Sequence, residues 1–230
     1  EVFNGAGNYD IDRILAKWGT PWDIEMPGIG VKQYPCCLST QAAVDTMIQV
    51  TREHDIQVGD VARVDARISA RRLGNHDRPA PRSALDAKLS TQYVLARGLA
   101  NREVSLQHFE VDSYRDPEIQ RALALVHVVP LDAQTLAREG DFFAEVAVTL
   151  KDGRSVTGRI DRPAGHHPGV PLPPDLLRAK FESCVHRHLG RQQMADFYMA
   201  VQTLEQIANV RQLTDHIIVA PLRSSSSSNC

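Results

Sequence analysis

Cysteine is scarce in this 230-residue chain, which carries only Cys36, Cys37, Cys184 and Cys230. Two of them are adjacent, and adjacent cysteines rarely bridge because the intervening peptide strains the disulfide geometry. This pattern argues against the disulfide framework of a small secreted domain. It favours a reducing, cytoplasmic location, where thiols stay free.

Long apolar runs and an excess of one charge are also missing. The longest apolar runs, such as residues 217–221, are far shorter than the roughly 20 residues that cross a bilayer, so we expect no membrane segment. The chain has 26 Lys and Arg against 28 Asp and Glu, a net charge of -2. It has no overall basic field to attract nucleic acid, and we expect no nucleic-acid partner.

The N-terminus offers neither a signal peptide nor an initiator Met. Residues Glu1–Gly5 (EVFNG) contain no basic region and no apolar core of the kind that a signal peptide requires. We therefore expect a chain that was trimmed, or cut from a longer protein.

The residues that are present have the composition of a globular protein, with 43% hydrophobic and 23% charged residues. Hydrophobic periodicity predicts helices at Tyr9–Trp18, Ala43–Glu53, Ala84–Leu99, Pro174–His188 and Gln192–Val210, and strands at Val61–Ser69, Leu125–Leu131, Phe143–Leu150 and Ser155–Ile160. An Asp-Gly turn at 151–154 joins the last two strands. Because strands and helices do not alternate regularly, the predicted fold class is α+β.

Clusters of potential metal ligands do not have the spacing that a metal site needs. Zinc requires three or four ligands, and His166 and His167 supply only two. Cys184, His186 and His188 would point in different directions from a helix, because only residues three or four apart share a face. We predict no metal site.

The stretch Lys32–Cys37 (KQYPCC) places a cation and a phenol just before a predicted helix N-terminus. Such a junction suits a substrate carboxylate, but on the residues alone a surface Lys beside a structural Tyr-Pro turn is preferred. Cys36 and Cys37 are either reactive thiols at the helix start or small buried residues. Further along, Lys88 lies within helical reach of Thr91 and Gln92, and Tyr93 belongs to the core or to a site.

Several motifs occur in a fixed order: Trp18–Ile24 (WGTPWDI), Gly30–Cys37 (GVKQYPCC), Thr40–Asp45 (TQAAVD), Leu85–Ser90 (LDAKLS), Tyr93, Asp116–Glu118 (DPE), Asp152–Arg154 (DGR), Pro163–Gly165 (PAG) and Lys180–Phe181 (KF). Together they resemble the MmgE/PrpD family, collinearly up to about Val185.

The resemblance implies a cofactor-free enzyme that acts on small di- or tricarboxylates. Members include 2-methylcitrate dehydratase, cis-aconitate decarboxylase and iminodisuccinate epimerase, which share proton movement at a carbon next to a carboxylate. It also implies a large helical domain and a smaller α+β domain, of which this chain is the C-terminal half. The expected parts are the end of the helical domain (1–26), the α+β domain (27–162), a proline-rich linker with returning helices (163–222) and a disordered tail (223–230).

The site residues follow from the same resemblance. It implies that Lys32 binds a carboxylate or stabilises charge and that Tyr93 is a catalytic phenol, with Tyr34, Gln41 and Lys88 as further substrate contacts. One departure stands out, because the family usually has His where this chain has Gln41. Glutamine cannot shuttle protons near neutral pH.

Three functions therefore stay open: a lyase or isomerase, an inactive fragment, and a carboxylate-binding module. The resemblance places the main acid/base residues in the helical half, which favours the inactive fragment more than the family alone would. We expect the terminal helices to need a partner, either a homodimer or a complementary helical chain. Their apolar face comprises Leu176, Leu177, Phe181, Phe197, Val201, Leu204 and Ile207.

Overall fold

The computed structural model describes residues 7, 10–16, 18–26, 28–140, 142–166 and 169–217. It consists of two compact units, Glu1–Pro173 and Pro174–Cys230. The predicted tail 223–230 lies outside the described residues, as do Tyr9, at the start of the first predicted helix, and His167.

The first unit contains most of the regular structure. Its helices are α1 (Ile11–Leu15), α2 (Gln41–Glu53), α3 (Ala70–Leu73), α4 (Ala84–Leu89), α5 (Thr91–Asn101), α6 (Pro117–Leu125) and α7 (Ala133–Glu139). Its 3-10 turns are η1 (Leu38–Thr40), η2 (Val58–Asp60), η3 (Gly74–His76), η4 (Leu106–Phe109) and η5 (Ser113–Arg115). Its strands are β1 (Val61–Ser69), β2 (Val126–Leu131), β3 (Ala144–Leu150) and β4 (Ser155–Ile160).

The strands form one sheet in the order β2-β1-β3-β4. β1 and β2 are parallel, and their connection contains α3 to α6, as a parallel pair requires a long crossover. β3 pairs antiparallel with β1 and with β4. Asp152 tightens the β3–β4 turn by accepting a hydrogen bond from the Arg154 N–H at 2.9 Å. The predicted α+β fold class is confirmed.

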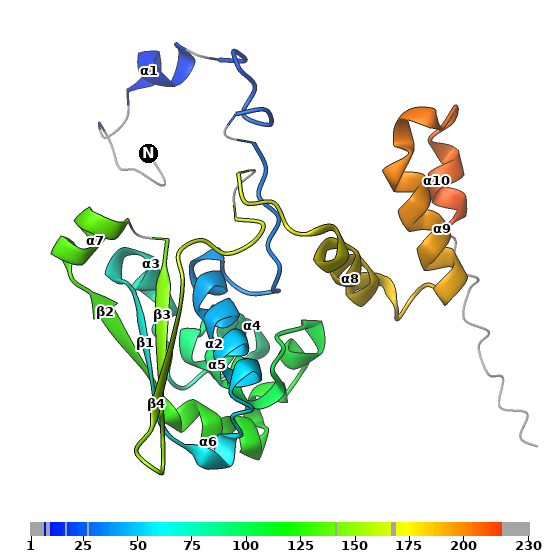
Figure 1. Cartoon of the computed structure of the whole chain (residues 1–230). Helices are drawn as coiled ribbons and strands as arrows, with labels where there is room; N and C mark the ends of the chain where they lie inside the picture. Colours follow the sequence, from blue (N-terminus) through cyan, green and yellow to red (C-terminus); the bar gives the residue numbers. More distant parts are fainter. Residues whose placement is uncertain are drawn as a thin grey trace, which may run out of the picture. The chain divides into compact units, whose positions relative to one another are not determined.

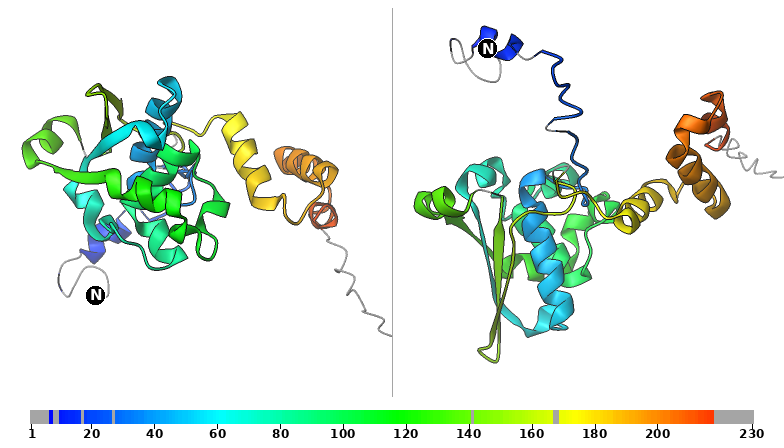
Figure 2. Two further views of the ribbon diagram at one scale, coloured as in Figure 1. Left: turned by 90° about the horizontal axis from the view of Figure 1, so that it is seen from below. Right: turned by 45° about the horizontal axis from the view of Figure 1, so that its top comes forward.

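One face of this sheet carries the core, and helices cover it (Figure 1). Val64, Ala66 and Ile68 of β1 are buried, whereas Arg63 and Arg67 are exposed, as period-two alternation dictates. α2 packs on β3 and β4, and α5 packs on α2 and β2. Figure 2 shows α2 running beside β4. The sequence thus builds two layers, a sheet and its helices.

Two long helices predicted from periodicity are in fact interrupted. The predicted helix Ala84–Leu99 divides at Ser90 into α4 and α5, because the Ser90 hydroxyl accepts a hydrogen bond from the Tyr93 N–H at 3.0 Å and caps α5. In the second unit, α8 (Pro174–Val185) is followed by α9 (Arg191–Gln202), η6 (Leu204–Gln206) and α10 (Arg211–Asp215). The helix predicted at Gln192–Val210 thus ends at Gln202, and α10 begins after its predicted end. None of these helices combines the length and apolarity needed to cross a bilayer among the residues described.

Tyr93 lies at the centre of the packing between α5 and the turns that follow it. Its side chain is 0% exposed, and its hydroxyl donates a hydrogen bond to the His108 carbonyl and accepts one from Arg97 Nε at 3.0 Å. Arg97 also donates to the Ser113 carbonyl at 2.7 Å. The phenol therefore ties α5 to η4 and, through Arg97, to η5.

Gly158 lets β4 approach α2 closely. A Cβ at this position would lie 2.5 Å from Val50 Cγ2 and 3.0 Å from Thr46 Cγ2. Both methyl groups belong to β-branched side chains of α2, which have little rotamer freedom in a helix. Only glycine leaves enough space for this contact.

Replacing Gly158 by alanine tests that contact. We expect Gly158→Ala to lower the free energy of unfolding by about 1–3 kcal/mol, because the added methyl group overpacks the β4–α2 interface. Urea unfolding followed by circular dichroism measures the change. Gly59→Ala is the control, since nothing lies within 4 Å of its added Cβ; its expected change is below about 0.5 kcal/mol. Equal effects at both positions would contradict the packing argument.

Removing the Tyr93 hydroxyl tests the network around it. We expect Tyr93→Phe to lower the free energy of unfolding by about 1–3 kcal/mol, because the His108 carbonyl and Arg97 Nε lose a buried partner. The ring contact with Phe109, at 5.8 Å between centroids, is retained. Tyr198→Phe in the second unit is the matched substitution, with an expected change below about 0.5 kcal/mol. An unchanged unfolding curve for Tyr93→Phe would rule out a structural role of the hydroxyl.

Candidate functional site

The loop Lys32–Cys37 is held on the first turn of α2 by Gln41. The Gln41 side chain is 1% exposed, and its Oε1 accepts a hydrogen bond from the Tyr34 N–H at 3.0 Å. Its Nε2 donates to the Tyr34 carbonyl at 3.1 Å and to the Cys37 carbonyl at 3.4 Å. Gln41 therefore satisfies the backbone of a buried loop and fixes its path.

Tyr34 fastens the same loop further along α2. Its hydroxyl donates a hydrogen bond to Asp45 Oδ1 at 2.5 Å. Burial, followed by the nearby Asp45 carboxyl, holds the pKa of the Tyr34 phenol above its ordinary value. Burial also raises the pKa of Asp45, although the hydrogen bond from Tyr34 lowers it in part. The phenol thus stays protonated and acts as the donor.

Lys32 emerges from this fixed loop as an exposed side chain. Its Nζ donates a hydrogen bond to the Cys36 carbonyl at 3.3 Å, next to the start of the continuous helical segment 38–53. The first N–H groups of a helix have no partner within the helix and carry partial positive charge. An ammonium beside them makes this position attractive to a carboxylate.

Cys37, at the end of the loop, pairs with a residue that the sequence analysis did not select. Its Sγ lies 3.1 Å from His76 Nε2, and His76 Nδ1 lies 3.2 Å from the Leu89 carbonyl. A carbonyl only accepts, so Nδ1 carries the proton and Nε2 accepts from the thiol. His76 was not among the predicted site residues, and no spacing in the sequence links it to Cys37. Packing of α3 against η1 brings the two together.

Cys36 differs from its neighbour in its burial and in its hydrogen-bond partners. It is 4% exposed, and its Sγ accepts hydrogen bonds from Thr40 Oγ1 at 3.4 Å and Gln41 Nε2 at 3.3 Å. Burial raises the pKa of Cys36 to about 12. Of the two interpretations open for the pair, the small buried residue describes Cys36.

A second segment passes close to the loop. The Val31 N–H donates to the Gly165 carbonyl at 2.6 Å, just before Lys32 in the chain. A Cβ at Gly165 would lie 1.9 Å from the Val31 carbonyl oxygen, and one at Gly30 would lie 2.5 Å from the His166 carbonyl oxygen. The two segments can approach this closely because Gly30 and Gly165 have no side chains. The approach brings His166 beside the loop.

Cationic and imidazole groups gather around Phe142, and we call Arg72, Arg162 and His166 the cationic rim. The Arg72 guanidinium lies 3.8 Å from the centroid of the Phe142 ring, and that of Arg162 lies 5.7 Å from it. The His166 ring is 4.4 Å from the Phe142 ring, centre to centre. Cation–π attraction favours guanidinium groups over an aromatic ring. The rim thus places two guanidinium groups near the segment that contacts Val31.

The two remaining predicted site residues take part in other contacts. Lys88 of α4 lies over the Phe109 ring, 5.8 Å from its centroid, and Tyr93 lies in the core with Arg97 and His108 as partners. The structure therefore brings Lys32 and Tyr34 of the loop together with Gln41 at the start of α2. Lys88 and Tyr93 belong to the packing behind it, and their roles toward a substrate stay predictions.

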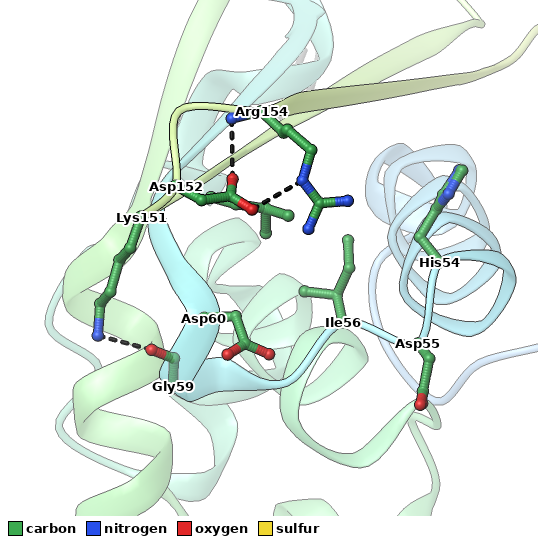
Figure 3. A pocket seen from close by; sticks show the side chains of 9 residues that line it. His54, Asp55, Ile56, Gly59, Asp60, Lys151, Asp152 and Arg154 are labelled. Atoms are coloured by element: carbon green, nitrogen blue, oxygen red, sulfur yellow. Dashed lines mark hydrogen bonds and ion pairs between the residues drawn. The ribbon is translucent and has the colours of Figure 1, made fainter.

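A hollow of about 300 Å³ lies at the opposite end of α2 (Figure 3). Figure 3 shows Lys151 donating to the Gly59 carbonyl at 2.6 Å and Arg154 bonded to Asp152 at 2.7 Å. These charged groups bind the protein itself, which favours a structural role for the hollow. The 13 residues of α2 place it roughly 20 Å from the Lys32 loop.

Metal ligands do not gather in groups of three among His, Cys, Asp and Glu anywhere in the described part of the chain. The charged or reactive groups at the loop are instead the Lys32 ammonium, the Cys37 thiol, the His76 imidazole and the cationic rim. Such an arrangement can bind anions and place a nucleophile beside them.

Comparison with known proteins agrees with the motifs. Residues 34–206 match the MmgE/PrpD C-terminal domain. The chain is 27% identical to cis-aconitate decarboxylase of Mus musculus over 218 residues, which cover 90% of this chain and 43% of that protein. It is also 27% identical to the Homo sapiens enzyme of the same name, over 84% of this chain and 40% of the relative. It thus spans less than half of their length. This chain belongs to the MmgE/PrpD family.

Proposed function

We propose that this chain forms the carboxylate-binding part of a lyase-type enzyme for small di- or tricarboxylates. The observation that carries the proposal is the position of Lys32, whose ammonium lies beside the start of the helical segment 38–53 on a loop clamped by Gln41. A point charge and helix N–H groups both favour a carboxylate there. The two relatives are named for cis-aconitate, a tricarboxylate.

The reaction that fits this family begins with loss of a proton from a carbon next to a carboxylate. Negative charge then develops on the carboxylate oxygens, and the Lys32 ammonium and helix N–H groups would stabilise it more strongly than they stabilise the ground state. Dehydration, decarboxylation and epimerisation share this step. In the cofactor-free reaction that the resemblance implies, protein side chains alone supply the charge and move the protons.

The cationic rim supports the choice of a substrate with more than one carboxylate. Arg72, Arg162 and His166 lie around Phe142, and the His166 segment contacts Val31, the residue before Lys32. A second carboxylate on the same substrate would meet arginine, which binds carboxylates through paired N–H groups.

Association with a helical partner is also part of the proposal, either with a complementary chain or with a second copy in a homodimer. The N-terminal segment exposes large apolar side chains: Ile11, Leu15, Trp18, Trp22, Ile24 and Met26. In the second unit, no described residue of α8 or α9 is buried. Surfaces of this kind favour association. The acid/base residues that the resemblance places in the helical half would come from a complementary chain, because a second copy repeats the residues already present.

A reducing location such as the cytoplasm is part of the proposal. Cys36, Cys37 and Cys184 are free thiols, and Cys184 is exposed. In an oxidising compartment an exposed thiol would be open to pairing with another chain.

Removing the charge of Lys32 tests the proposal. We expect Lys32→Met to weaken binding of citrate and cis-aconitate by about 10- to 100-fold, which corresponds to one hydrogen bond to a charged group. Titration calorimetry on the full chain measures the change. Lys151→Met is the matched control, because Lys151 donates to the Gly59 carbonyl at the opposite end of α2.

Either of two results would contradict the proposal: no binding by the unchanged chain, or equal losses for the two lysine variants. Proton NMR in heavy water on the same samples reports on turnover. Exchange of a substrate alpha-proton that Lys32→Met abolishes would show a complete site within this chain. Binding without exchange is the result expected of a carboxylate-binding part that needs a helical partner.

A further inference from the structure

The Cys37–His76 pair has no task in the proposed carboxylate chemistry, although it stands on the same loop as Lys32. The thiol donates to His76 Nε2 across 3.1 Å, and the Leu89 carbonyl holds His76 Nδ1 at 3.2 Å. Three separate segments thus supply a nucleophile, a base and a group that orients the base. This is the arrangement by which proteins activate a thiol.

Solvent exposure distinguishes the Cys37 thiol from that of Cys36. Cys37 is partly exposed, whereas Cys36 is 4% exposed and bonded to Thr40 and Gln41. The raised pKa of Cys36, about 12, keeps its thiol protonated. Cys36 and Cys37 are adjacent but differ in access, so the modification rate of one can be compared with that of the other in the same protein.

We propose that Cys37, activated by His76, is a site of covalent modification by electrophilic carboxylates that Lys32 guides to it. The guidance by Lys32 rests on the proposed function, and the activation by His76 does not. Lys32 Nζ contacts the Cys36 carbonyl, one residue from the thiol, so a carboxylate bound by the ammonium has its carbon chain near Cys37. α,β-Unsaturated acids are electrophilic carboxylates of this kind.

The chemistry requires no additional reagent. As the Cys37 proton passes to His76 Nε2, the sulfur adds to the β-carbon of the unsaturated acid and forms a carbon–sulfur bond. The electron pair of the double bond moves to the α-carbon and its carboxylate, where the Lys32 ammonium stabilises it. The imidazolium returns the proton to the α-carbon, so the thioether contains every atom of both reactants. A haloacid reacts by displacement instead, with halide leaving.

The activation is tested by alkylation of the reduced full chain with iodoacetamide, with each cysteine located by peptide fragmentation. We expect Cys37 to react about tenfold faster than Cys184, the exposed thiol of the second unit, and Cys36 to stay unmodified. His76→Asn should reduce the rate at Cys37 to that of Cys184 or below. Continued protection of Cys36 in the variant shows that the loop remains folded. A Cys37 rate no higher than that of Cys184, or unaffected by His76→Asn, would overturn the proposal.

The guidance is tested by comparing iodoacetate, which carries a carboxylate, with neutral iodoacetamide. We expect the rate ratio of the two reagents at Cys37 to fall severalfold in Lys32→Met, and the ratio at Cys184 to stay constant. Maleate should add to Cys37 before Cys184. A reactive Cys37 with no preference for iodoacetate or maleate would overturn the guidance and count against the proposed function. An unreactive Cys37 would overturn this inference and leave the proposed function standing.

Discussion

The side-chain amide of Gln41 replaces a missing stretch of backbone pairing, and the candidate site depends on it. Its oxygen and nitrogen bond the N–H and carbonyl of Tyr34, as a neighbouring strand would. Each buried backbone group left unpaired would cost about 1–3 kcal/mol, so without this amide the loop would leave the core. With it, Lys32 and Cys37 are presented from a path that is fixed by hydrogen bonds.

α2 connects this loop to the sheet, because it packs on β3 and β4. It carries Gln41 at its first turn and Asp45 about one turn later, and both hold the loop. Thr46 and Val50 of the same helix pack against β4 at Gly158. A helix seated this closely on a sheet has little freedom to shift, because protein interiors are packed as densely as organic crystals. Because Gln41 and Asp45 of α2 bind the loop, the loop is held in place as well. A binding position for a small acid requires such fixed geometry.

Local patterns predicted much of this structure. Alternation in Val61–Ser69 predicted β1 with its observed bounds, and the Asp-Gly turn predicted the β3–β4 hairpin, since both depend on neighbours in the sequence. The interruption at Ser90 was not predicted, because apolar spacing continues through it while the hydroxyl caps the next helix. Within the site, Lys32, Tyr34 and Gln41 were selected from the family resemblance, because their motifs lie close together in the sequence, and their roles toward a substrate stay predictions.

Contacts between the loop and distant segments of the chain could be seen only in the three-dimensional structure. Cys37 and His76 are 39 positions apart, and nothing in either segment indicates the other until α3 packs on η1. Arg72, Arg162 and His166 likewise meet around Phe142 from separate segments. The sequence by itself determined the fold class, the family and the loop that carries the charge, since these follow from short-range patterns and motif order. The tertiary structure alone decided which thiol is buried and which faces a base, because burial and through-space contacts depend on the packing of distant segments.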